Sequence, residues 1–581
     1  MRNYDFWRSV IKPAASSTML SRRAALGGAA ALAGLAGSLP VDKASASEPE
    51  HGPDPKHATD AKSIIVASRD SSVVETTTGR VRGYARNGIH TFKGIPYAES
   101  TAGANRFMPP TKMKAWTGVR SSMHYGPVSP QPARAGWKND EESFMFLWDD
   151  GIAGEDCLRV NVWTPGLDAT KRPVMVWLHG GGFVAGSGQE LRAYDGENLA
   201  RRGDVVVVTL NHRLGALGFL DLSQSKDERF AKSGNVGMLD IVAALEWVRD
   251  NIAAFGGNPG CVTVFGQSGG GGKVAALMAM PSASGLFHRA IVESGSIMRV
   301  RSPQGAAPLT EQLLKELDLD YARLTELQYL PHQQVIAVSA RILARQPPRM
   351  PDFRRMAEQL GWGPVNDGAV LPQHPFDPAA PAISANVPMI VGTNLNEFVH
   401  NINKPDGEAM TEDQMLGLVR GIYGDRTPGV VAAFRERTPG ATPFDLWSHI
   451  AAAPVRAAAI EQCTRKAAQR AAPAYLYWFA WQTPVLDGRP HAFHCAELPF
   501  VFNNAERCET MTGGGPQAIE LAHKMSDAWV RFARTGNPNG AGLPNWPSFN
   551  TERLPTMVFD NRCEVQDGPD ANEQAAIAQT T

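Results

Sequence analysis

The stretch "VTVFGQSGGGGKVAAL", residues 262–277, decides the fold, and two interpretations compete for it. A phosphate-binding loop has the pattern glycine, any four residues, glycine, lysine, and then serine or threonine. When this pattern is aligned on Lys273, the first required glycine falls on Gln267, and Val274 stands where the hydroxyl residue belongs. Because two required positions do not match, we do not expect this loop to bind a nucleotide.

The same stretch satisfies the pattern G-x-S-x-G through Gly266, Ser268 and Gly270. The short β-branched run at 261–265 is typical of a strand, and residues 273–280 are typical of a helix. A sharp turn between strand and helix would hold the Ser268 hydroxyl exposed on a strained backbone, with glycines leaving room around it. This arrangement predicts a covalent serine nucleophile.

Near-continuous apolar runs along the chain predict strands that are buried on both faces. They lie at 173–179, 204–211, 262–266, 289–294, 387–393 and 474–481, with helical stretches such as 237–256 between several of them. We therefore expect an α/β fold with a large, mostly parallel central sheet and helices on both faces. Near the N-terminus, alternating residues around Asn87 and Gly88 predict a small antiparallel hairpin region. Ligands of such sheets bind beyond the carboxyl ends of the strands, where Ser268 is expected.

The N-terminal segment 1–46 is expected to be an export signal peptide and not part of the fold. Paired arginines at 22–23 precede an apolar run rich in alanine and glycine, and residues 44–46 form an A-x-A cleavage pattern. The segment resembles a twin-arginine leader, which implies export to the periplasm or beyond the cell. The apolar run is too short and too rich in glycine for a membrane span, so no stable membrane insertion is expected. Translation from Met19 is an alternative start.

The mature chain is expected to form one domain over 73–565, between a flexible segment 47–72 and a C-terminal tail 566–581. Without the leader it carries 51 Lys and Arg against 56 Asp and Glu, a net charge of −5. This mild charge does not provide the electrostatic footprint of a protein that binds nucleic acid. The six cysteines lack the close paired spacing of a zinc site, and no metal or cofactor is expected.

A serine nucleophile needs a base, an acid that orients the base, and hydrogen-bond donors for the oxyanion. The sequence HGGGF at 179–183 ends a predicted strand, and its consecutive glycines allow backbone N–H groups to face one point. We expect the N–H groups of Gly181, Gly182 and Gly269 to form the oxyanion hole. A plain glycine turn is the alternative interpretation of HGGGF, and the G-x-S-x-G motif downstream favours the oxyanion hole.

Blocks of sequence in a fixed order resemble the type-B carboxylesterase family, which includes cholinesterases and many bacterial esterases. They are KGIPYAE (93–99), EDCLRVNVWTP (155–165), HGGGFVAGSG (179–188), NHRLGALGFL (211–220), FGQSGGG (265–271), LFHRAIVESGS (286–296), VGTNLNEF (391–398) and HCAELPFVF (494–502). The resemblance covers residues 73–560. It implies an α/β-hydrolase fold and a serine esterase that needs no cofactor.

The resemblance also implies the remaining members of a catalytic triad, in the chain order serine, acid, histidine. The family acid falls on Glu397 in VGTNLNEF, and the family histidine falls on His494, before ELPFVF. His491 is the nearest competing histidine, but its spacing to ELPFVF does not match. Ser294 matches a family serine that supports the acid by hydrogen bonding, and a turn-capping role is the alternative for it.

Besides Asn396, where the family often has aspartate, three departures from the family pattern lie next to these residues. Gln267 precedes the nucleophile, where cholinesterases and many relatives carry a glutamate that helps to hold a cationic substrate. Because that charge is missing, we expect uncharged aliphatic or aryl esters and no preference for choline esters. Phe398 and Cys495 stand where the family has glycine. Phe398 is expected to reshape its loop, and Cys495 is expected to be a small replacement.

Two further positions resemble scaffold features of the family. Arg106 and Glu155 correspond to a structural ion pair. Cys157 occupies the family's disulfide position, but Ser129 stands where its partner would lie, so this loop is expected to be unbridged. None of these residues is expected to take part in catalysis.

The leading hypothesis is a serine hydrolase that cleaves small carboxylic esters through an acyl-enzyme intermediate. The first alternative keeps the same triad but acts on amide, carbamate or xenobiotic diester bonds. The second is a non-catalytic binding protein on the same fold, because a fold alone does not prove activity. Such relatives typically lose a triad member, whereas this chain keeps all three. The protein is expected to be a monomer or a weak homo-oligomer.

Overall fold

A computed structural model describes residues 64–132, 140–346, 356–359 and 361–578. The predicted signal peptide, residues 1–46, lies outside the described residues, as does most of the segment 47–72. No helix in the described ranges combines the length and the apolar character that a membrane span requires.

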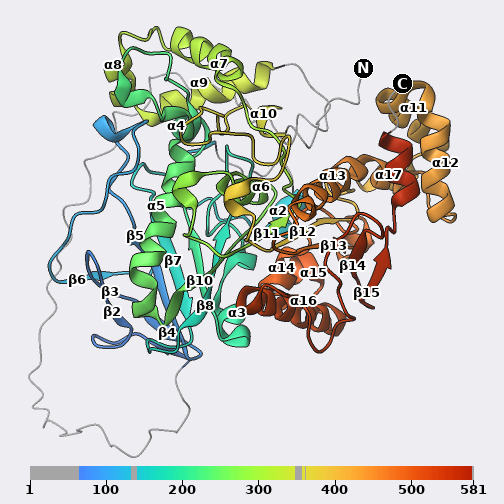
Figure 1. The fold of residues 1–581 in the computed structure, drawn as a ribbon, viewed down its shortest axis with the longest axis horizontal. Coiled ribbons are helices and arrows are strands. Elements are labelled where there is room, and N and C mark those ends of the chain that lie inside the picture. The colour runs from blue at the N-terminus through green and yellow to red at the C-terminus, as the bar shows by residue number, and fades with distance from the viewer. Residues whose placement is uncertain (1–63, 133–139, 347–355, 360, 579–581) are drawn as a thin grey trace, which may run out of the picture. The chain divides into compact units, whose positions relative to one another are not determined.

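A large mixed sheet contains the predicted buried strands at its centre (Figure 1). In spatial order its strands are β1 (Ile65–Val66), β4 (Tyr84–Arg86), β5 (Ile89–Pro96), β7 (Arg159–Thr164), β9 (Val206–Leu210), β8 (Arg172–Leu178), β10 (Gly257–Gln267), β11 (Arg289–Glu293), β12 (Met389–Asn394), β13 (Ala474–Phe479), β14 (Pro555–Phe559) and β15 (Glu564–Asp567). Neighbouring strands from β9 to β14 are parallel, and the strands toward both edges are antiparallel. The apolar runs found in the sequence correspond to β8 through β13, so the predicted α/β architecture is confirmed.

Helices cover both faces of this sheet (Figure 1). The α-helices of the described residues are α2 (Asp140–Phe146), α3 (Glu197–Gly203), α4 (Gly215–Phe219), α5 (Val236–Asn251), α6 (Gly269–Leu277), α7 (Pro303–Glu316), α8 (Leu324–Tyr329), α9 (His332–Arg345), α10 (Met356–Gln359), α11 (Glu412–Tyr423), α12 (Thr427–Arg437), α13 (Pro443–Ala468), α14 (Leu498–Val501), α15 (Glu509–Thr512), α16 (Pro516–Thr535) and α17 (Ala571–Ala578). In β8, Val174 and Val176 pack in the core that contains α5 and α6, whereas Met175 and Trp177 pack in the core that contains α3 and α16. Because alternate side chains enter opposite cores, the buried strands are apolar throughout.

The predicted hairpin is present, and it extends the large sheet. Strands β4 and β5 pair antiparallel, with Arg86 opposite Ile89. Asn87 and Gly88 between them have φ values of 49° and 81°, and a two-residue hairpin turn of this hand requires positive φ at both positions. A separate small sheet contains β2 (Val73–Thr76), β3 (Gly79–Arg82) and β6 (Val119–Ser121).

The domain extends beyond the predicted limits 73–565 at both ends. Strand β1 pairs with β4, although it lies in the segment 47–72 that the sequence predicts to be flexible. The predicted tail 566–581 completes β15 and contains α17. A strand of two residues and a helix of eight are too short to be stable alone, so contacts with the rest of the domain order them.

Arginine–carboxylate pairs hold α17 against its neighbouring helices, and one of them is buried. Arg456 of α13 donates to Asp570, with 3.3 Å between Nε and Oδ2, and the two side chains are only 3% and 5% exposed. Arg437 of α12 donates to Glu573 of α17. Removing one partner of a buried pair leaves an uncompensated charge. The C-terminal segment is therefore an integral part of the domain.

The substitution Asp570→Ala leaves the Arg456 guanidinium buried without its partner charge. Because breaking a buried ion pair is costly, we expect the free energy of unfolding to fall by about 3 kcal/mol. The control is Glu412→Ala, which breaks an exposed pair with Arg435 and is expected to cost less than about 1 kcal/mol. Urea unfolding followed by tryptophan fluorescence measures both variants. Equal losses in the two variants would show that this pair does not anchor α17.

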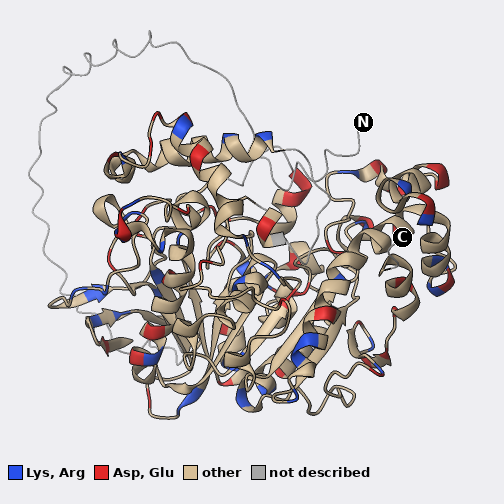
Figure 2. Ribbon diagram, turned by 45° about the horizontal axis from the view of Figure 1, so that its top comes forward, with Lys and Arg blue, Asp and Glu red and all other residues tan. Residues whose placement is uncertain are grey.

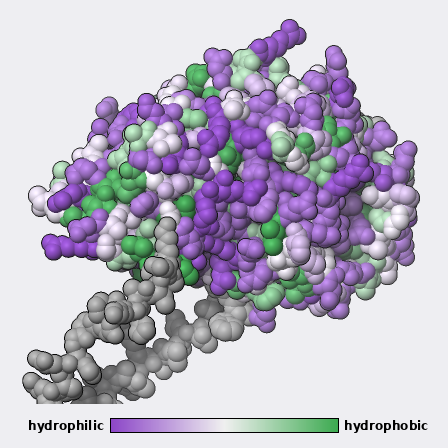
Figure 3. Space-filling view, turned by 90° about the horizontal axis from the view of Figure 1, so that it is seen from below, coloured by the Kyte–Doolittle hydropathy of each residue, from purple (hydrophilic) through white to green (hydrophobic). Residues whose placement is uncertain are grey.

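The surface of the domain mixes charges of both signs. Figure 2 shows Lys and Arg interspersed with Asp and Glu along the elements of the ribbon. The face seen in Figure 3 is largely hydrophilic, and its apolar residues form separate patches.

Candidate active site

Ser268 lies at the corner between β10 and α6, as the G-x-S-x-G motif predicts. Its backbone angles are φ 57° and ψ −124°, a combination that residues with a Cβ rarely adopt. The Ser268 N–H donates to the Glu293 carbonyl at 2.7 Å, and the Gly272 N–H donates to the Ser268 carbonyl at 3.1 Å. A Cβ on Gly270 would come within 1.9 Å of the Leu178 carbonyl oxygen, so this corner requires glycine.

A short hydrogen bond joins the predicted acid to the predicted base. His494 Nδ1 lies 2.6 Å from Glu397 Oε2. Glu397 follows β12 and is fully buried, and its Oε1 accepts the Asn394 N–H at 2.8 Å. The His494 N–H donates to the Glu397 carbonyl at 2.7 Å, so the backbones of the two loops are joined as well. A carboxylate on Nδ1 favours the tautomer in which Nε2 accepts a proton.

The imidazole of His494 contacts the residue next to the nucleophile. Gln267 Nε2 lies 3.2 Å from His494 Nε2, and Gln267 directly precedes Ser268. Within the part of the chain that the structure describes, Ser268 Oγ forms no hydrogen bond with this ring. A Ser268–His494 hydrogen bond therefore requires the side chains to rotate. Catalytic hydrogen bonds of this kind often tighten only when substrate is bound.

The three departures from the family pattern form one cluster around the imidazole. The Phe398 ring lies over the His494 ring, with centroids 3.9 Å apart and 33° between the planes. Cys495 Sγ donates to Gln267 Oε1 at 3.3 Å. The thiol thus orients the Gln267 amide so that its NH₂ group faces the ring. In the sequence these positions are separate anomalies, and only the structure shows that they act on the same side chain.

The glycines predicted to bind the oxyanion lie in two adjoining loops. Gly181 and Gly182 have φ values of 79° and 61°, which glycine adopts without steric cost. A Cβ on Gly269 would lie 2.2 Å from the Gly182 carbonyl oxygen, so the two backbones touch. Gly269 is the first residue of α6, where a backbone N–H has no partner within the helix. Gly182 and Gly269 line the same cavity as Ser268, and Gly181 precedes Gly182 in the chain.

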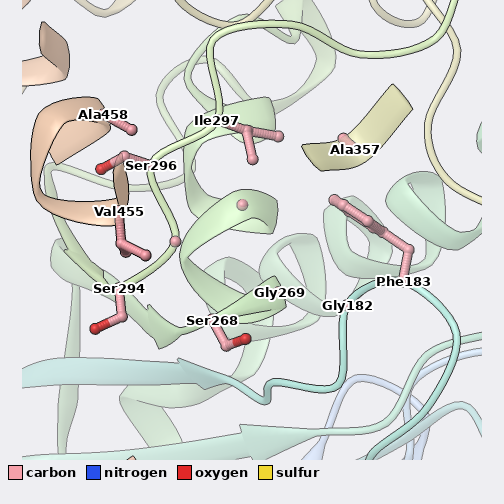
Figure 4. Close-up of a pocket in the computed structure, with 12 residues that line it drawn as sticks. Gly182, Phe183, Ser268, Gly269, Ser294, Ser296, Ile297, Ala357, Val455 and Ala458 are labelled. Atoms are coloured by element: carbon pink, nitrogen blue, oxygen red, sulfur yellow. The ribbon is translucent and has the colours of Figure 1, made fainter. Parts of the chain in front are cut away.

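A small cavity opens over Ser268 (Figure 4). Its lining side chains are uncharged, and they belong to Gly182, Phe183, Ser268, Gly269, Gly272, Ser294, Gly295, Ser296, Ile297, Ala357, Val455 and Ala458. In Figure 4, Val455 and Ala458 on α13 lie beside Ser296 and close one side of the cavity. Such walls suit an uncharged organic group.

Ser294 lies in the wall of this cavity, directly after β11. Its Oγ is buried and forms no hydrogen bond with another described residue. The predicted hydrogen bond from Ser294 to the acid is therefore not present. The two carboxylate oxygens of Glu397 accept instead from His494 and from the Asn394 N–H.

Two further glutamates are buried in this region, and the sequence patterns do not single them out. Glu293 accepts from Trp529 Nε1 at 2.8 Å, and Glu497 accepts from Asn394 Nδ2 at 2.6 Å. Burial raises the pKa of Glu293 to about 8. Burial, followed by the charges of Glu293 and Glu397, raises the pKa of Glu497 well above its usual value. Burial thus favours the neutral form of both carboxyls, which reduces the like charge beside Glu397.

The predicted scaffold features are present. Arg106 and Glu155 form a buried bidentate pair, with both nitrogen–oxygen distances at 2.7 Å. Cys157 is a free buried thiol, as expected, and Ser129 Oγ instead accepts the Leu214 N–H at 3.1 Å. Among the residues with described positions, no group of three His, Cys, Asp or Glu side chains is placed to hold a metal ion.

The chain is similar over most of its length to known esterases. The family model described as the carboxylesterase family matches residues 70–427 and 446–577. The para-nitrobenzyl esterase of Bacillus subtilis (strain 168) is 35% identical over 512 residues, which cover 87% of this chain and 98% of that protein. The phenmedipham hydrolase of Pseudarthrobacter oxydans is 33% identical, with 85% and 96% covered. The crystal structure of a carboxylesterase from Geobacillus stearothermophilus at pH 6.2 is 36% identical with a TM-score of 0.72, and the match covers 87% of this chain and 99% of that one.

The buried Glu293 carboxyl makes the stability of the domain depend on pH. Its pKa is raised from 4.5 to about 8, so the folded state keeps a proton that the unfolded state loses above pH 4.5. Below pH 4.5 the carboxyl is protonated in both the folded and the unfolded state, so its ionisation does not affect stability. As the pH rises from 4.5 toward 8, the group destabilises the fold by roughly 1.4 kcal/mol per pH unit at most.

The substitution Glu293→Gln keeps an acceptor for Trp529 and removes the ionisable group. We expect its melting temperature to match that of the wild type at pH 5 and to exceed it clearly at pH 8, measured by differential scanning calorimetry. Glu75→Gln is the control, because Glu75 is 71% exposed and its substitution is expected to give no such pH dependence. A difference between Glu293→Gln and wild type that stays constant from pH 5 to pH 8 would contradict the prediction.

Proposed function

The chain belongs to the carboxylesterase family and hydrolyses carboxylic esters, and we propose that Ser268, His494 and Glu397 carry out the reaction. One observation carries this proposal, which is the 2.6 Å hydrogen bond between His494 Nδ1 and Glu397 Oε2. The ring of this pair contacts Gln267, the residue before the strained Ser268 corner. A nucleophile, a base and an acid in this chain order match the triad logic of serine hydrolases.

The reaction proceeds through an acyl-enzyme. His494 releases Gln267, turns toward Ser268, and accepts its proton at Nε2 while Oγ attacks the ester carbonyl carbon. Glu397 balances the charge of the protonated ring. His494 then donates the proton to the leaving alcohol, and the acyl group stays on Ser268. Water attacks this acyl group by the same steps, and the carboxylic acid is released.

The oxyanion hole stabilises the charge on the carbonyl oxygen during both attacks. Its proposed donors are the N–H groups of Gly181, Gly182 and Gly269, which come from the two touching loops. The contact between Gly182 and Gly269 supports this assignment, since it leaves no room for a side chain between the loops. Losing one such donor typically costs a hundred- to a thousand-fold in kcat.

Uncharged esters are the proposed substrate class. The residue before the nucleophile is the neutral Gln267, and the cavity over Ser268 is lined by glycine, apolar and hydroxyl side chains. A cationic alcohol would find no carboxylate in that wall to balance its charge. Compact aliphatic or aryl groups fit such a cavity better.

The same triad would also serve for amide, carbamate or xenobiotic diester bonds, which form the second candidate. The similarity to a phenmedipham hydrolase favours including such substrates. A panel of a p-nitrobenzyl ester, an anilide, a carbamate and phenmedipham at a fixed enzyme concentration separates the two candidates. If the protein is mainly an esterase, the p-nitrobenzyl ester has the largest kcat/KM of the panel.

We also propose that the protein is exported and acts as a monomer or a weak homo-oligomer. The support for export is the paired arginines at 22–23 and the cleavage pattern at 44–46, both of which lie outside the described residues.

The substitution Ser268→Ala tests the nucleophile. We expect kcat for p-nitrophenyl acetate and butyrate to fall by at least about 10⁴-fold, because no other group can form the acyl-enzyme. Labelling by a fluorophosphonate probe is expected to disappear as well. Ser296→Ala is the control, since this serine lines the same cavity, and its kcat is expected to stay within about tenfold of wild type. Hydrolysis by Ser268→Ala at the wild-type rate would refute the mechanism, and unlabelled but folded wild type would favour a binding protein.

The substitution Gln267→Glu tests the source of the preference for neutral substrates. A carboxylate beside the nucleophile attracts a cationic alcohol group. We expect the ratio of kcat/KM for a choline ester to that for its neutral 3,3-dimethylbutyl counterpart to rise about tenfold. The ratio cancels any change in the chemical step, which matters because Gln267 also contacts His494. An unchanged ratio would show that this position does not set the charge preference.

A further inference from the structure

Lys273 is a fully buried lysine in α6, five residues after the nucleophile. It is the residue that gives the loop its superficial likeness to a phosphate-binding motif. Its Nζ donates to the His179 carbonyl at 2.8 Å and to the Gly180 carbonyl at 3.4 Å. The ammonium group therefore faces the HGGG loop.

The two carbonyls belong to the peptide groups that lead into the oxyanion hole. The Gly180 carbonyl and the Gly181 N–H are two ends of one planar peptide, in which C=O and N–H point in opposite directions. A cation on the carbonyl end fixes the direction of the N–H end and polarises it. The Gly181 N–H is one of the proposed oxyanion donors, so Lys273 acts on it without touching the substrate.

A lysine at this depth is costly for the fold. Burying an ammonium group requires hydrogen bonds to offset the loss of water. Lys273 is the middle residue of α6, so neither helix terminus compensates its charge. An aliphatic side chain of similar length would fill the same space without these costs. Features that break local rules in this way are expected at functional sites.

The neighbouring His212 does not add a second positive charge to that of Lys273. His179 and His212 stack with centroids 5.0 Å apart and 22° between the planes. Burial, followed by the charge of Lys273, holds the pKa of His212 well below its usual value. His212 is thus neutral, so it adds no second cation beneath the HGGG loop. The Gly180 carbonyl oxygen lies 3.0 Å from His179 Nδ1 and 3.4 Å from Lys273 Nζ, so the lysine shares this acceptor with the neighbouring imidazole.

We propose that Lys273 is a positioning residue for the oxyanion hole, which fixes and polarises the Gly180–Gly181 peptide against the negative charge of the tetrahedral intermediate. The inference rests on the proposed serine esterase mechanism. It predicts that Lys273 contributes to the transition state and not to the binding of neutral substrate.

The test compares Lys273→Met with Lys466→Met. Lys466 is a matched control because it is also fully buried and also donates to two carbonyls, those of Ser384 at 2.9 Å and Ala385 at 2.7 Å, at a place that the mechanism does not involve. For Lys273→Met we expect kcat for p-nitrophenyl butyrate to fall ten- to a hundred-fold with KM within twofold. For Lys466→Met we expect both constants to stay within twofold, even if its melting temperature falls as much.

Inhibitor binding separates positioning from a general loss of structure. Phenylboronic acid forms a tetrahedral anion on a serine and so resembles the intermediate, whereas a neutral amide analogue of the substrate resembles the ground state. We expect Lys273→Met to weaken boronate binding by the same factor as kcat and to leave binding of the amide within twofold. Equal losses for both inhibitors, or a kcat no lower than that of Lys466→Met, would overturn the proposal.

Two further variants keep the outcome decisive. If Lys273→Met does not fold, Lys273→Gln makes the same comparison, since it keeps a hydrogen-bond donor and removes the charge. The Ser268→Ala variant distinguishes a failure of the Lys273 proposal from a failure of the proposed serine esterase mechanism. A Ser268→Ala variant that is inactive together with a Lys273→Met variant that equals wild type refutes only the role of Lys273. An active Ser268→Ala variant refutes the mechanism itself.

Discussion

The hydrogen bond between Glu397 and His494 is the interaction on which the site depends. Glu397 is fully buried, where a carboxylate needs a partner for each oxygen. His494 Nδ1 and the Asn394 N–H supply those partners at 2.6 and 2.8 Å. Burial raises the pKa of the neighbouring Glu293 and Glu497, so it reduces the negative charge that opposes a charge on Glu397. The buried, doubly hydrogen-bonded Glu397 carboxylate therefore fixes the orientation of His494, the proposed base.

The parallel sheet explains how residues far apart in the chain reach this pair. Strands β8, β10, β11 and β12 run in one direction, so their carboxyl ends meet at one edge. The glycines of HGGG, Ser268, Ser294 and Glu397 follow these four strands in turn, and His494 lies in the loop after β13. The edge is also crowded, since a Cβ on Gly269 or Gly270 would collide with the loop after β8 or with its last carbonyl. Close backbone approach brings together the glycines proposed to form the oxyanion hole.

The chain departs from its family around the imidazole, and the departures act together. Gln267 supplies a neutral amide where relatives place a charge, Cys495 orients that amide, and Phe398 covers the ring. Besides Glu397, the ring therefore contacts an uncharged amide next to the nucleophile. Lys273 acts on the opposite component of the site, the HGGG loop, through its carbonyls. The positive charge of Lys273 thus faces the HGGG loop, whereas the side chains that line the substrate cavity are uncharged.

The sequence by itself determined the strands β8 to β13 and the place of Ser268, because two-faced burial and a strained glycine corner impose a local composition. Glu397 and His494 were identified through the family pattern. Only the tertiary structure decided that α17 belongs to the domain, that Ser294 does not support Glu397, and what surrounds His494. These outcomes depend on contacts across the chain, such as the 227 residues that separate Gln267 from His494. Contacts over such distances leave no local pattern, so they exist only once the fold has formed.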